Sequence, residues 1–244
     1  MTRQLKRLGS PGAWNIRKKE HTFVIKTAPG PHDGTALPVA VWLRDHVHLA
    51  RNLREARIIL NQREIIVNGR SVRDPRQGIG VFDIISIPRT GSYYRVLKDK
   101  KGRLVTIEIG EEDARTRLCK IANKTVVRGG KVQLNLLYGG NVLADHTYRP
   151  RDSVVLTMGD PATGEGRFEI IDHFPFAEGN MAMVIGGRHS GEMGRIVEIR
   201  EIPGSGSNRV VLEGQDGERF DTIDDYVFMV GRENPAVESW GIEA

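Results

Sequence analysis

One stretch of the chain, residues 43–88, constrains the fold more than any other part of the sequence. Two short amphipathic helical patterns come first, and the second predicts a helix over Leu53–Asn61. Asn52 and Glu55 have the spacing of a capping box, in which side chains satisfy backbone N–H groups at the start of a helix. The predicted helix therefore packs on a core through one face. Its apolar residues are Leu53, Ala56, Ile59 and Leu60.

A β-hairpin follows this helix in the same stretch. Residues 65–67 and 70–72 form two short strand-like runs separated by Asn68 and Gly69. Asn-Gly between such runs favours a type I′ turn, because both central residues of that turn need a positive φ. A further strand is predicted over residues 82–87 and ends at a proline. The stretch thus predicts a helix pair followed by a small sheet.

The polar side of the predicted helix carries cations. Arg54, Arg57 and Asn61 fall at positions i, i+3 and i+7, so they share one face. A row of arginines without an acidic cluster suits a phosphate backbone, which guanidinium groups bind through charge-assisted, often bidentate hydrogen bonds. For each arginine taken alone, the alternative is a solvated surface charge. The candidate RNA contacts in this stretch are Arg44, Arg51, Arg54, Arg57, Arg63, Asn68, Gly69 and Arg70.

Basic residues are concentrated in the first part of the chain. Residues 1–134 hold 27 Lys and Arg against 12 Asp and Glu, a net charge of +15, and residues 135–244 hold 9 against 19, a net charge of −10. Such asymmetry predicts a polyanionic partner for the N-terminal part. Nucleic acid fits better than a membrane, because the cations are spread over loops, helix and hairpin and form no lipid-facing helix.

The sequence also favours a cytoplasmic location. It has no apolar run near the ~20 residues of a transmembrane helix. Its charged N-terminus lacks the apolar core of a signal peptide. The single cysteine, Cys119, forms neither an internal disulfide nor a multi-thiolate metal site.

Four segments of the stretch 43–88 resemble a known RNA-binding module, the S-four-type domain with its alpha-L motif. The segments are Leu43-Arg44-Asp45, Arg54-Glu55-Ala56, Val67-Asn68-Gly69-Arg70 and Asp83-Ile84-Ile85. The module occurs in a ribosomal protein, in some RNA-modifying enzymes and in a tRNA synthetase. The resemblance therefore implies RNA binding and leaves the particular protein open.

Residues 1–42 are predicted to form an extended basic arm, because glycine and proline are frequent and apolar periodicity is weak. By composition alone, a solvated, disordered tail is the alternative. Trp14 and Phe23 either stack on bases or dock on protein. The run LKRLGSPGAWNI at residues 5–16, followed by PGPH at 29–32, is similar to the start of the archaeal and eukaryotic small-subunit ribosomal protein family S-four-e. That resemblance implies an arm that packs into rRNA through Lys6, Arg7, Arg17, Lys18 and Lys19.

The remainder of the chain is predicted to be rich in β-structure. Over residues 104–172, short alternating runs separated by glycine-rich turns predict a compact central β domain. Residues 173–244 resemble a small SH3-like barrel with a KOW motif, followed by a tail. The turn of this motif either contacts RNA or, given its acidic surroundings, packs on protein. Its residues are Gly187, Arg188, His189, Gly191, Gly194 and Arg195.

Motifs of catalysis and cofactor binding are missing from the sequence. It contains no P-loop, GxSxG, HExxH or CxxC pattern. His46 and His48 lie two residues apart, the wrong spacing for one face of a helix. Cys119 has no identifiable partner base and is interpreted as a packed core thiol. We therefore predict no enzymatic activity, no cofactor and no metal site.

Three functions compete. A structural rRNA-binding protein of the small ribosomal subunit explains the basic arm, the arginine face and the missing active site, and the S-four-e resemblance spans essentially the whole chain. An RNA-modifying enzyme would need a catalytic aspartate motif or a glycine-rich S-adenosylmethionine site. A translation or transcription factor using the KOW-like barrel would associate with ribosomes only transiently.

The first hypothesis predicts an α+β multidomain fold with four parts. These are a basic N-terminal arm (1–42), an S-four-type RNA-binding domain (43–103), a central mostly-β domain (104–172) and a C-terminal KOW/SH3-like β-barrel with a tail (173–244). The expected partners are small-subunit rRNA and neighbouring ribosomal proteins. No membrane, small-molecule substrate or self-association is expected.

Overall fold

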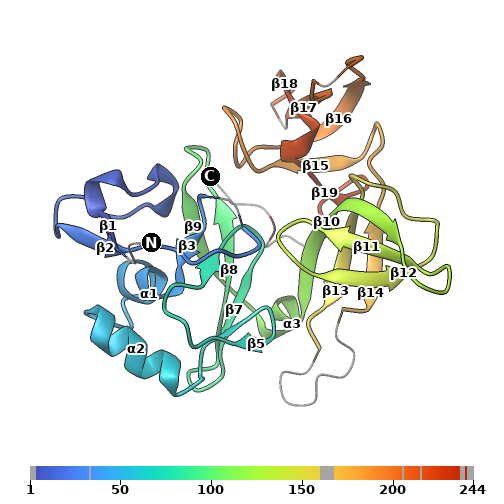
Figure 1. Ribbon diagram of the computed structural model, residues 1–244. Helices are drawn as coiled ribbons and strands as arrows, with labels where there is room; N and C mark the ends of the chain where they lie inside the picture. Colours follow the sequence, from blue (N-terminus) through green and yellow to red (C-terminus); the bar gives the residue numbers. More distant parts are fainter. Residues whose placement is uncertain are drawn as a thin grey trace. The chain divides into compact units, whose positions relative to one another are not determined.

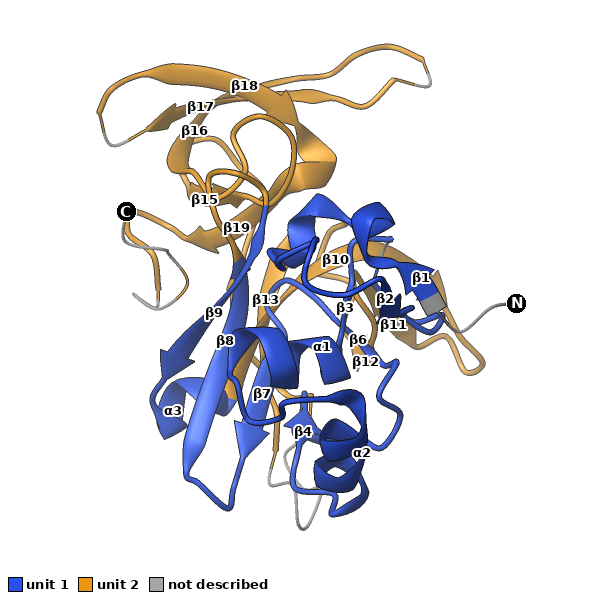
Figure 2. Cartoon of the chain, turned by 90° about the vertical axis from the view of Figure 1, so that its left-hand side faces the viewer, with its two compact units in different colours: residues 1–97, 103–115, 160–164 blue, residues 98–102, 116–159, 165–244 orange. Residues whose placement is uncertain are grey.

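The structure is a computed structural model that describes residues 4–32, 34–159, 168–204, 206–214, 216–236 and 240. The chain forms two compact units (Figure 1, Figure 2). Unit 1 comprises residues 1–97, 103–115 and 160–164, and unit 2 comprises residues 98–102, 116–159 and 165–244. Most elements of the described residues are β-strands and the helices are few, in line with the predicted β-rich fold.

Unit 1 contains the helices predicted from the sequence. A turn of α-helix, α1 (Val39–Val41), runs into a π-helical turn, η3 (Trp42–His46), and α2 (Leu53–Asn61) follows. The Asn52 side chain caps α2, because its Oδ1 accepts a hydrogen bond from the Glu55 N–H at 3.0 Å. The Glu55 carboxylate reaches back to the N–H of the residue before the cap at 2.7 Å. The predicted capping box is therefore confirmed, with its return bond shifted by one residue.

The predicted hairpin forms one end of a five-stranded sheet in unit 1, with strand order β5-β4-β7-β8-β9. The turn has a φ of 49° at Asn68 and 70° at Gly69, which are the positive angles of a type I′ turn. The strands of this sheet are β4 (Ile66–Val67), β5 (Arg70–Ser71), β7 (Ile84–Ile87), β8 (Ser92–Lys98) and β9 (Leu104–Ile109). The other elements in this part are β3 (Leu37–Pro38), its partner β6 (Gly78–Ile79), and α3 (Glu111–Ala114).

Two strands of unit 1 differ from the sequence prediction. β7 begins two residues late because Phe82, with a φ of 61°, belongs to the preceding turn. β9, which its position assigns to the central β domain, is instead the edge strand of the unit 1 sheet. A contact between distant residues also joins β9 to the helices of unit 1, since Trp42 Nε1 donates a 2.9 Å hydrogen bond to Thr106 Oγ1. The four domain boundaries stay predictions.

The basic arm is folded within unit 1, which contradicts the prediction of an extended segment. β1 (Gln4–Lys6) pairs antiparallel with β2 (Phe23–Ile25). Trp14 is buried, and its Nε1 donates a hydrogen bond to the Thr35 carbonyl at 3.1 Å. A few individual contacts hold the arm, and for this reason periodicity did not reveal its fold. Two 3-10 turns lie between its strands, η1 (Arg7–Gly9) and η2 (Gly12–Trp14).

Unit 2 contains two five-stranded antiparallel sheets, with strand orders β12-β11-β10-β13-β14 and β18-β17-β16-β15-β19. The first consists of β10 (Thr116–Val126), β11 (Val132–Leu136), β12 (Asn141–Ala144), β13 (Ser153–Thr157) and β14 (Ile170–Phe174). The second consists of β15 (Met181–Val184), β16 (Met193–Arg200), β17 (Arg209–Gly214), β18 (Arg219–Ile223) and β19 (Val227–Gly231), with a 3-10 turn, η4 (Asp224–Tyr226), before β19. Strands are present where sequence alternation predicts them, and the assignment of the second sheet to an SH3-like barrel stays a prediction.

Buried polar contacts join the two sheets of unit 2. Lys120 on β10 donates through Nζ to the backbone carbonyls of Asp224 and Asp225, at 2.7 and 3.1 Å. Ser153 Oγ on β13 accepts a hydrogen bond from the Met229 N–H on β19 at 3.1 Å. Both contacts link residues more than 70 positions apart in the chain, and they hold the C-terminal sheet to the central one within this unit.

Candidate nucleic-acid interface

The arginines predicted on α2 and the hairpin are exposed. Arg54 and Arg57 extend from the solvent side of α2, Arg51 and Arg63 flank the helix, and Arg70 lies on β5. α2 and the hairpin occupy the same end of unit 1 (Figure 1, Figure 2). Among the described residues, none of these five side chains has a hydrogen-bonding or ionic partner. Their guanidinium groups are free to bind an external phosphate.

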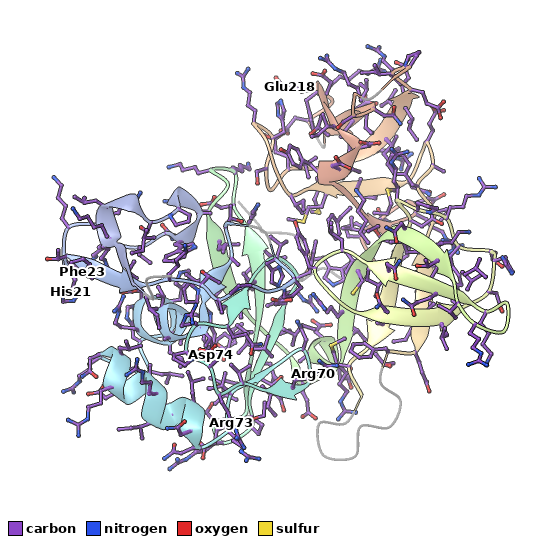
Figure 3. The ribbon with its side chains drawn as sticks, viewed as in Figure 1. His21, Phe23, Arg70, Arg73, Asp74 and Glu218 are labelled. Carbon is purple, nitrogen blue, oxygen red and sulfur yellow. The ribbon has the colours of Figure 1, made fainter. Side chains whose placement is uncertain are left out.

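A sixth arginine, Arg73, extends this set and was not among the predicted contacts. It follows the hairpin, is exposed, and likewise has no side-chain partner in the described part of the chain. Figure 3 shows Arg70 and Arg73 on the side of unit 1 that carries the hairpin and the C-terminal end of α2. The sequence did hold a signal, because Arg70, Arg73 and Arg76 recur every third residue. We call Arg51, Arg54, Arg57, Arg63, Arg70 and Arg73 the arginine face.

Two of the predicted arginines pair with Asp45 inside the protein. Arg7 is 0% exposed, and its guanidinium lies 3.3 Å from Asp45 and 3.5 Å from Glu20. Its Nε also donates to the Arg17 carbonyl at 2.6 Å. Arg44 is half-buried and pairs with Asp45 at 2.6 Å. Arg7 therefore holds the arm in place and is not part of the arginine face.

Asp45 is the acidic centre that fixes the arm. Burial acts to raise the pKa of its carboxyl, but the guanidinium groups of Arg44 and Arg7 together outweigh burial and lower that pKa. The carboxylate therefore stays charged and forms an ion pair with each of the two arginines. His46, the next residue, contacts the arm as well, since its Nε2 lies 3.0 Å from the Trp14 carbonyl oxygen. Burial lowers the pKa of this imidazole.

The other predicted cations of the arm are accessible to different degrees. Lys6 and Lys19 are exposed. Arg17 is also exposed but pairs with Glu20 at 3.2 Å. Lys18 is half-buried, and its Nζ donates to the Ser10 carbonyl at 2.9 Å. Among the predicted arm cations, Lys6 and Lys19 are thus the best placed to reach an external anion.

At the hairpin tip, the Asn68 side chain is turned inward. Its Nδ2 donates to Asp83 Oδ1 at 2.7 Å, and its Oδ1 accepts from the Ile84 N–H at 3.0 Å. Asp83 is buried and also accepts from the Gly80 N–H at 2.9 Å, while its Oδ2 lies 2.6 Å from His32 Nε2. The amide of Asn68 therefore shapes the turn, and only the glycine and backbone at the tip remain for RNA.

The predicted KOW-like turn has the glycine geometry expected of a tight connection. Gly187 and Gly191 have φ values of 77° and 81°, which residues with a Cβ rarely adopt. Gly194 lies in β16, where a Cβ would come within 2.7 Å of the Glu213 carbonyl oxygen. These three glycines therefore serve the backbone of this hairpin.

The side chains of the KOW-like turn divide into two groups. Arg188 and Arg195 are exposed. The His189 ring stacks on Phe220 with a centroid distance of 4.6 Å, and its Nδ1 lies 3.0 Å from the Glu192 carboxylate. His189 is thus committed to packing within unit 2. Contact of the turn with RNA or with protein stays a prediction.

Reactive and metal-binding groups are sparse in the part of the chain that the structure describes. Cys119 is a buried cysteine outside any disulfide, as predicted for a core residue. Over the described residues there is no group of three or more His, Cys, Asp or Glu side chains that could hold a metal ion. None of the described helices has the length and apolar character needed to span a membrane.

These features define a class of protein: a β-rich scaffold that presents unpaired arginines from a helix-and-hairpin module.

Comparison with known proteins identifies the family within this class. Two family models match the chain, the RS4NT (NUC023) domain over residues 1–34 and Ribosomal family S4e over residues 90–161. The chain belongs to ribosomal family S4e, a family of structural ribosomal proteins and not of enzymes.

Individual relatives agree with this assignment along the whole chain. The chain is 56% identical to small ribosomal subunit protein eS4 of Methanospirillum hungatei, with 100% of both chains covered. It is 42% identical to the eS4 protein of Methanothermobacter thermautotrophicus, covering 96% of this chain and 95% of that one. The crystal structure of 30S ribosomal protein S4e from Thermoplasma acidophilum aligns with a TM-score of 0.62 at 28% identity, covering 80% of this chain and 92% of that one. The predicted S-four-e family is confirmed.

Proposed function

We propose that this protein is a structural component of the small ribosomal subunit, where it binds rRNA and supports subunit assembly and translation in the cytoplasm. Its similarity to eS4 proteins over the full chain carries the proposal. The arginine face supports it, because six exposed guanidinium groups without partners among the described residues suit a phosphate backbone. Its partners would be small-subunit rRNA and neighbouring ribosomal proteins.

The arginine face would position the protein on RNA more than it would recognise a sequence. Bidentate guanidinium–phosphate bonds fix orientation and carry little sequence information. Specificity would then come from the shape of the folded RNA and from unstacked bases in loops or junctions. The short loop between α2 and β4 keeps the helix and the hairpin close together, so both can follow one RNA backbone.

Charge reversal on α2 tests the proposed face. We expect Arg54→Glu combined with Arg57→Glu to abolish binding to a small-subunit rRNA transcript in a filter-binding assay. Both side chains are exposed, so the circular dichroism spectrum and the thermal unfolding midpoint should stay close to those of the wild type.

A matched control separates position from net charge. Arg209→Glu with Arg219→Glu changes the charge by the same amount on exposed side chains of β17 and β18. This control should bind rRNA within a few-fold of the wild type. If both double variants lost binding equally, a general charge effect would replace the arginine face as the explanation. If the α2 variant bound normally, the face would be assigned wrongly.

Residence on the ribosome distinguishes a structural protein from a transient factor. After sucrose-gradient fractionation of a native lysate, we expect about one copy for each small subunit, retained through a moderate salt wash. A translation or transcription factor with the same modules would instead be sub-stoichiometric and would leave the particles at low ionic strength.

A further inference from the structure

A groove of about 550 Å³ opens on unit 1 beside the arginine face, and two of the predicted contact residues, Arg44 and Arg57, line it. Its apolar part comes from Val24 on β2, Val41 on α1 and Leu53 on α2. Its polar part includes Arg57 of the arginine face and the loop residues Asp74 and Arg76. Because the folded arm supplies one wall, this groove would not exist if the arm were extended.

Phe23 gives the groove an unused aromatic ring. Phe23 lines the groove from β2, yet the residue is 54% exposed. Its position in unit 1 is labelled in Figure 3. The other aromatic residue of the arm, Trp14, is buried and hydrogen-bonded to the Thr35 carbonyl. Of the two rings that the sequence offered for stacking, only Phe23 is therefore accessible.

The charges at the groove are arranged for a ligand with both an anionic and a hydrogen-donating part. Arg57 has no partner among the described residues, and Arg76 is held in place by a 3.4 Å hydrogen bond from its Nε to the Lys26 carbonyl. Asp74 uses Oδ1 to accept the Arg76 N–H at 2.9 Å and is otherwise exposed. A phosphate would be attracted to the arginines and repelled by the carboxylate, which can accept N–H groups of a base.

We propose that this groove holds one unstacked nucleotide of the bound RNA, with its base against Phe23 and its phosphate on Arg57. The inference rests on the proposed rRNA binding and deepens it by naming a nucleotide subsite. The groove volume is within the range of small-ligand sites, which suits a single nucleotide. Base stacking on an aromatic ring is sequence-tolerant, and the Asp74 carboxylate adds a preference for bases with donor groups on their edge. A protein partner is less favoured, because guanidinium groups at the groove, one of them unpaired, match a phosphodiester better than an apolar side chain.

Truncation of the ring tests the subsite in the full-length protein. Phe23→Ala should weaken binding to the small-subunit rRNA transcript about 5- to 100-fold, the effect of losing one stacked base. The salt dependence of the affinity should not change, because no phosphate contact is removed. Phe23→Tyr, which keeps the ring, should bind like the wild type. Leu8→Ala, which truncates another exposed apolar residue of the arm outside the groove, should also bind like the wild type.

Chemical probing of the transcript at nucleotide resolution gives the second readout. A base protected by the wild type and by Phe23→Tyr should become reactive with Phe23→Ala. Suppose that Phe23→Ala kept the wild-type affinity and protection while the α2 charge reversal lost binding. The nucleotide subsite would then be disproved, and the proposed rRNA-binding function would be supported. Normal rRNA binding by Phe23→Ala with poor incorporation into small subunits would show that the ring docks on a protein, which also overturns the proposal. If the wild type failed to bind rRNA selectively, both the subsite and the proposed function would be disproved.

Discussion

At the scale of the residue, Lys120 in unit 2 has a strongly lowered pKa. Burial lowers the pKa of its ammonium to about 8, and the carboxylates of Asp225 and Asp224 only partly oppose that shift. The ammonium lies 5.7 Å from the centre of the Phe228 ring and donates to the two backbone carbonyls already described. The hydrogen bonds and the aromatic ring stabilise the ammonium in this position. Its removal from water on folding lowers the free energy of unfolding.

The pH dependence of stability should reveal this lysine. Because its pKa is lower in the folded chain than the ordinary value of 10.5, the unfolded chain binds the proton more tightly between about pH 8 and 10.5. The free energy of unfolding should therefore rise across that range, by on the order of 3 kcal/mol from this group. In Lys120→Met this rise should be absent, as measured by urea denaturation at a series of pH values. Lys131→Met, an exposed control, should keep the wild-type dependence, and parallel curves for all three proteins would contradict the assignment.

At the scale of the element, the hairpin and the arm depend on one buried carboxylate. Asp83 accepts hydrogen bonds from Asn68 in the β4–β5 turn and from the Gly80 N–H, and it contacts His32 at the end of the arm. Three segments distant in sequence thus meet at a single side chain. The turn that precedes Arg70 and residue His32 of the arm are therefore held by the same carboxylate.

Asp83→Ala should destabilise the protein by about 3 kcal/mol or more, because it leaves several buried polar groups without their acceptor. Urea denaturation followed by circular dichroism measures this loss. Asp74→Ala removes an exposed carboxylate from the neighbouring loop and should change the free energy of unfolding by less than about 1 kcal/mol. Equal losses for the two variants would show that the buried network is not what holds these segments.

The same elements show how far the sequence leads. α2 and the hairpin were predictable because their signals are local. The capping contacts of α2 join residues at most four positions apart, and the hairpin turn is formed by the adjacent residues Asn68 and Gly69. The folded arm was not, because it depends on Arg7 meeting Asp45, 38 positions later, and Arg7 looks like any other cation of a glycine- and proline-rich segment. For the same reason composition could indicate the arginine face but could not tell the buried Trp14 from the exposed Phe23. Local sequence patterns therefore predict helices and strands. Single contacts between residues distant in sequence determine which side chains are buried and which stay exposed.

At the scale of the whole molecule, the uneven charge sets how binding responds to salt. If the six arginines of the arginine face each neutralise one phosphate, the affinity for rRNA should fall about 10³-fold when the salt concentration rises fourfold. Filter binding at several ionic strengths measures the slope of log affinity against log salt. Arg54→Glu with Arg57→Glu should flatten that slope by about two phosphate contacts or more wherever residual binding is measurable. A slope near zero for the wild type would rule out a phosphate-dominated interface.

The folded arm has a consequence for how unit 1 folds. Arg7 pairs with Asp45 and His32 with Asp83, so the arm settles only when these distant residues of the same unit are in place. The groove gains its β2 wall only at that stage, whereas α2 and the hairpin carry the arginine face without the arm.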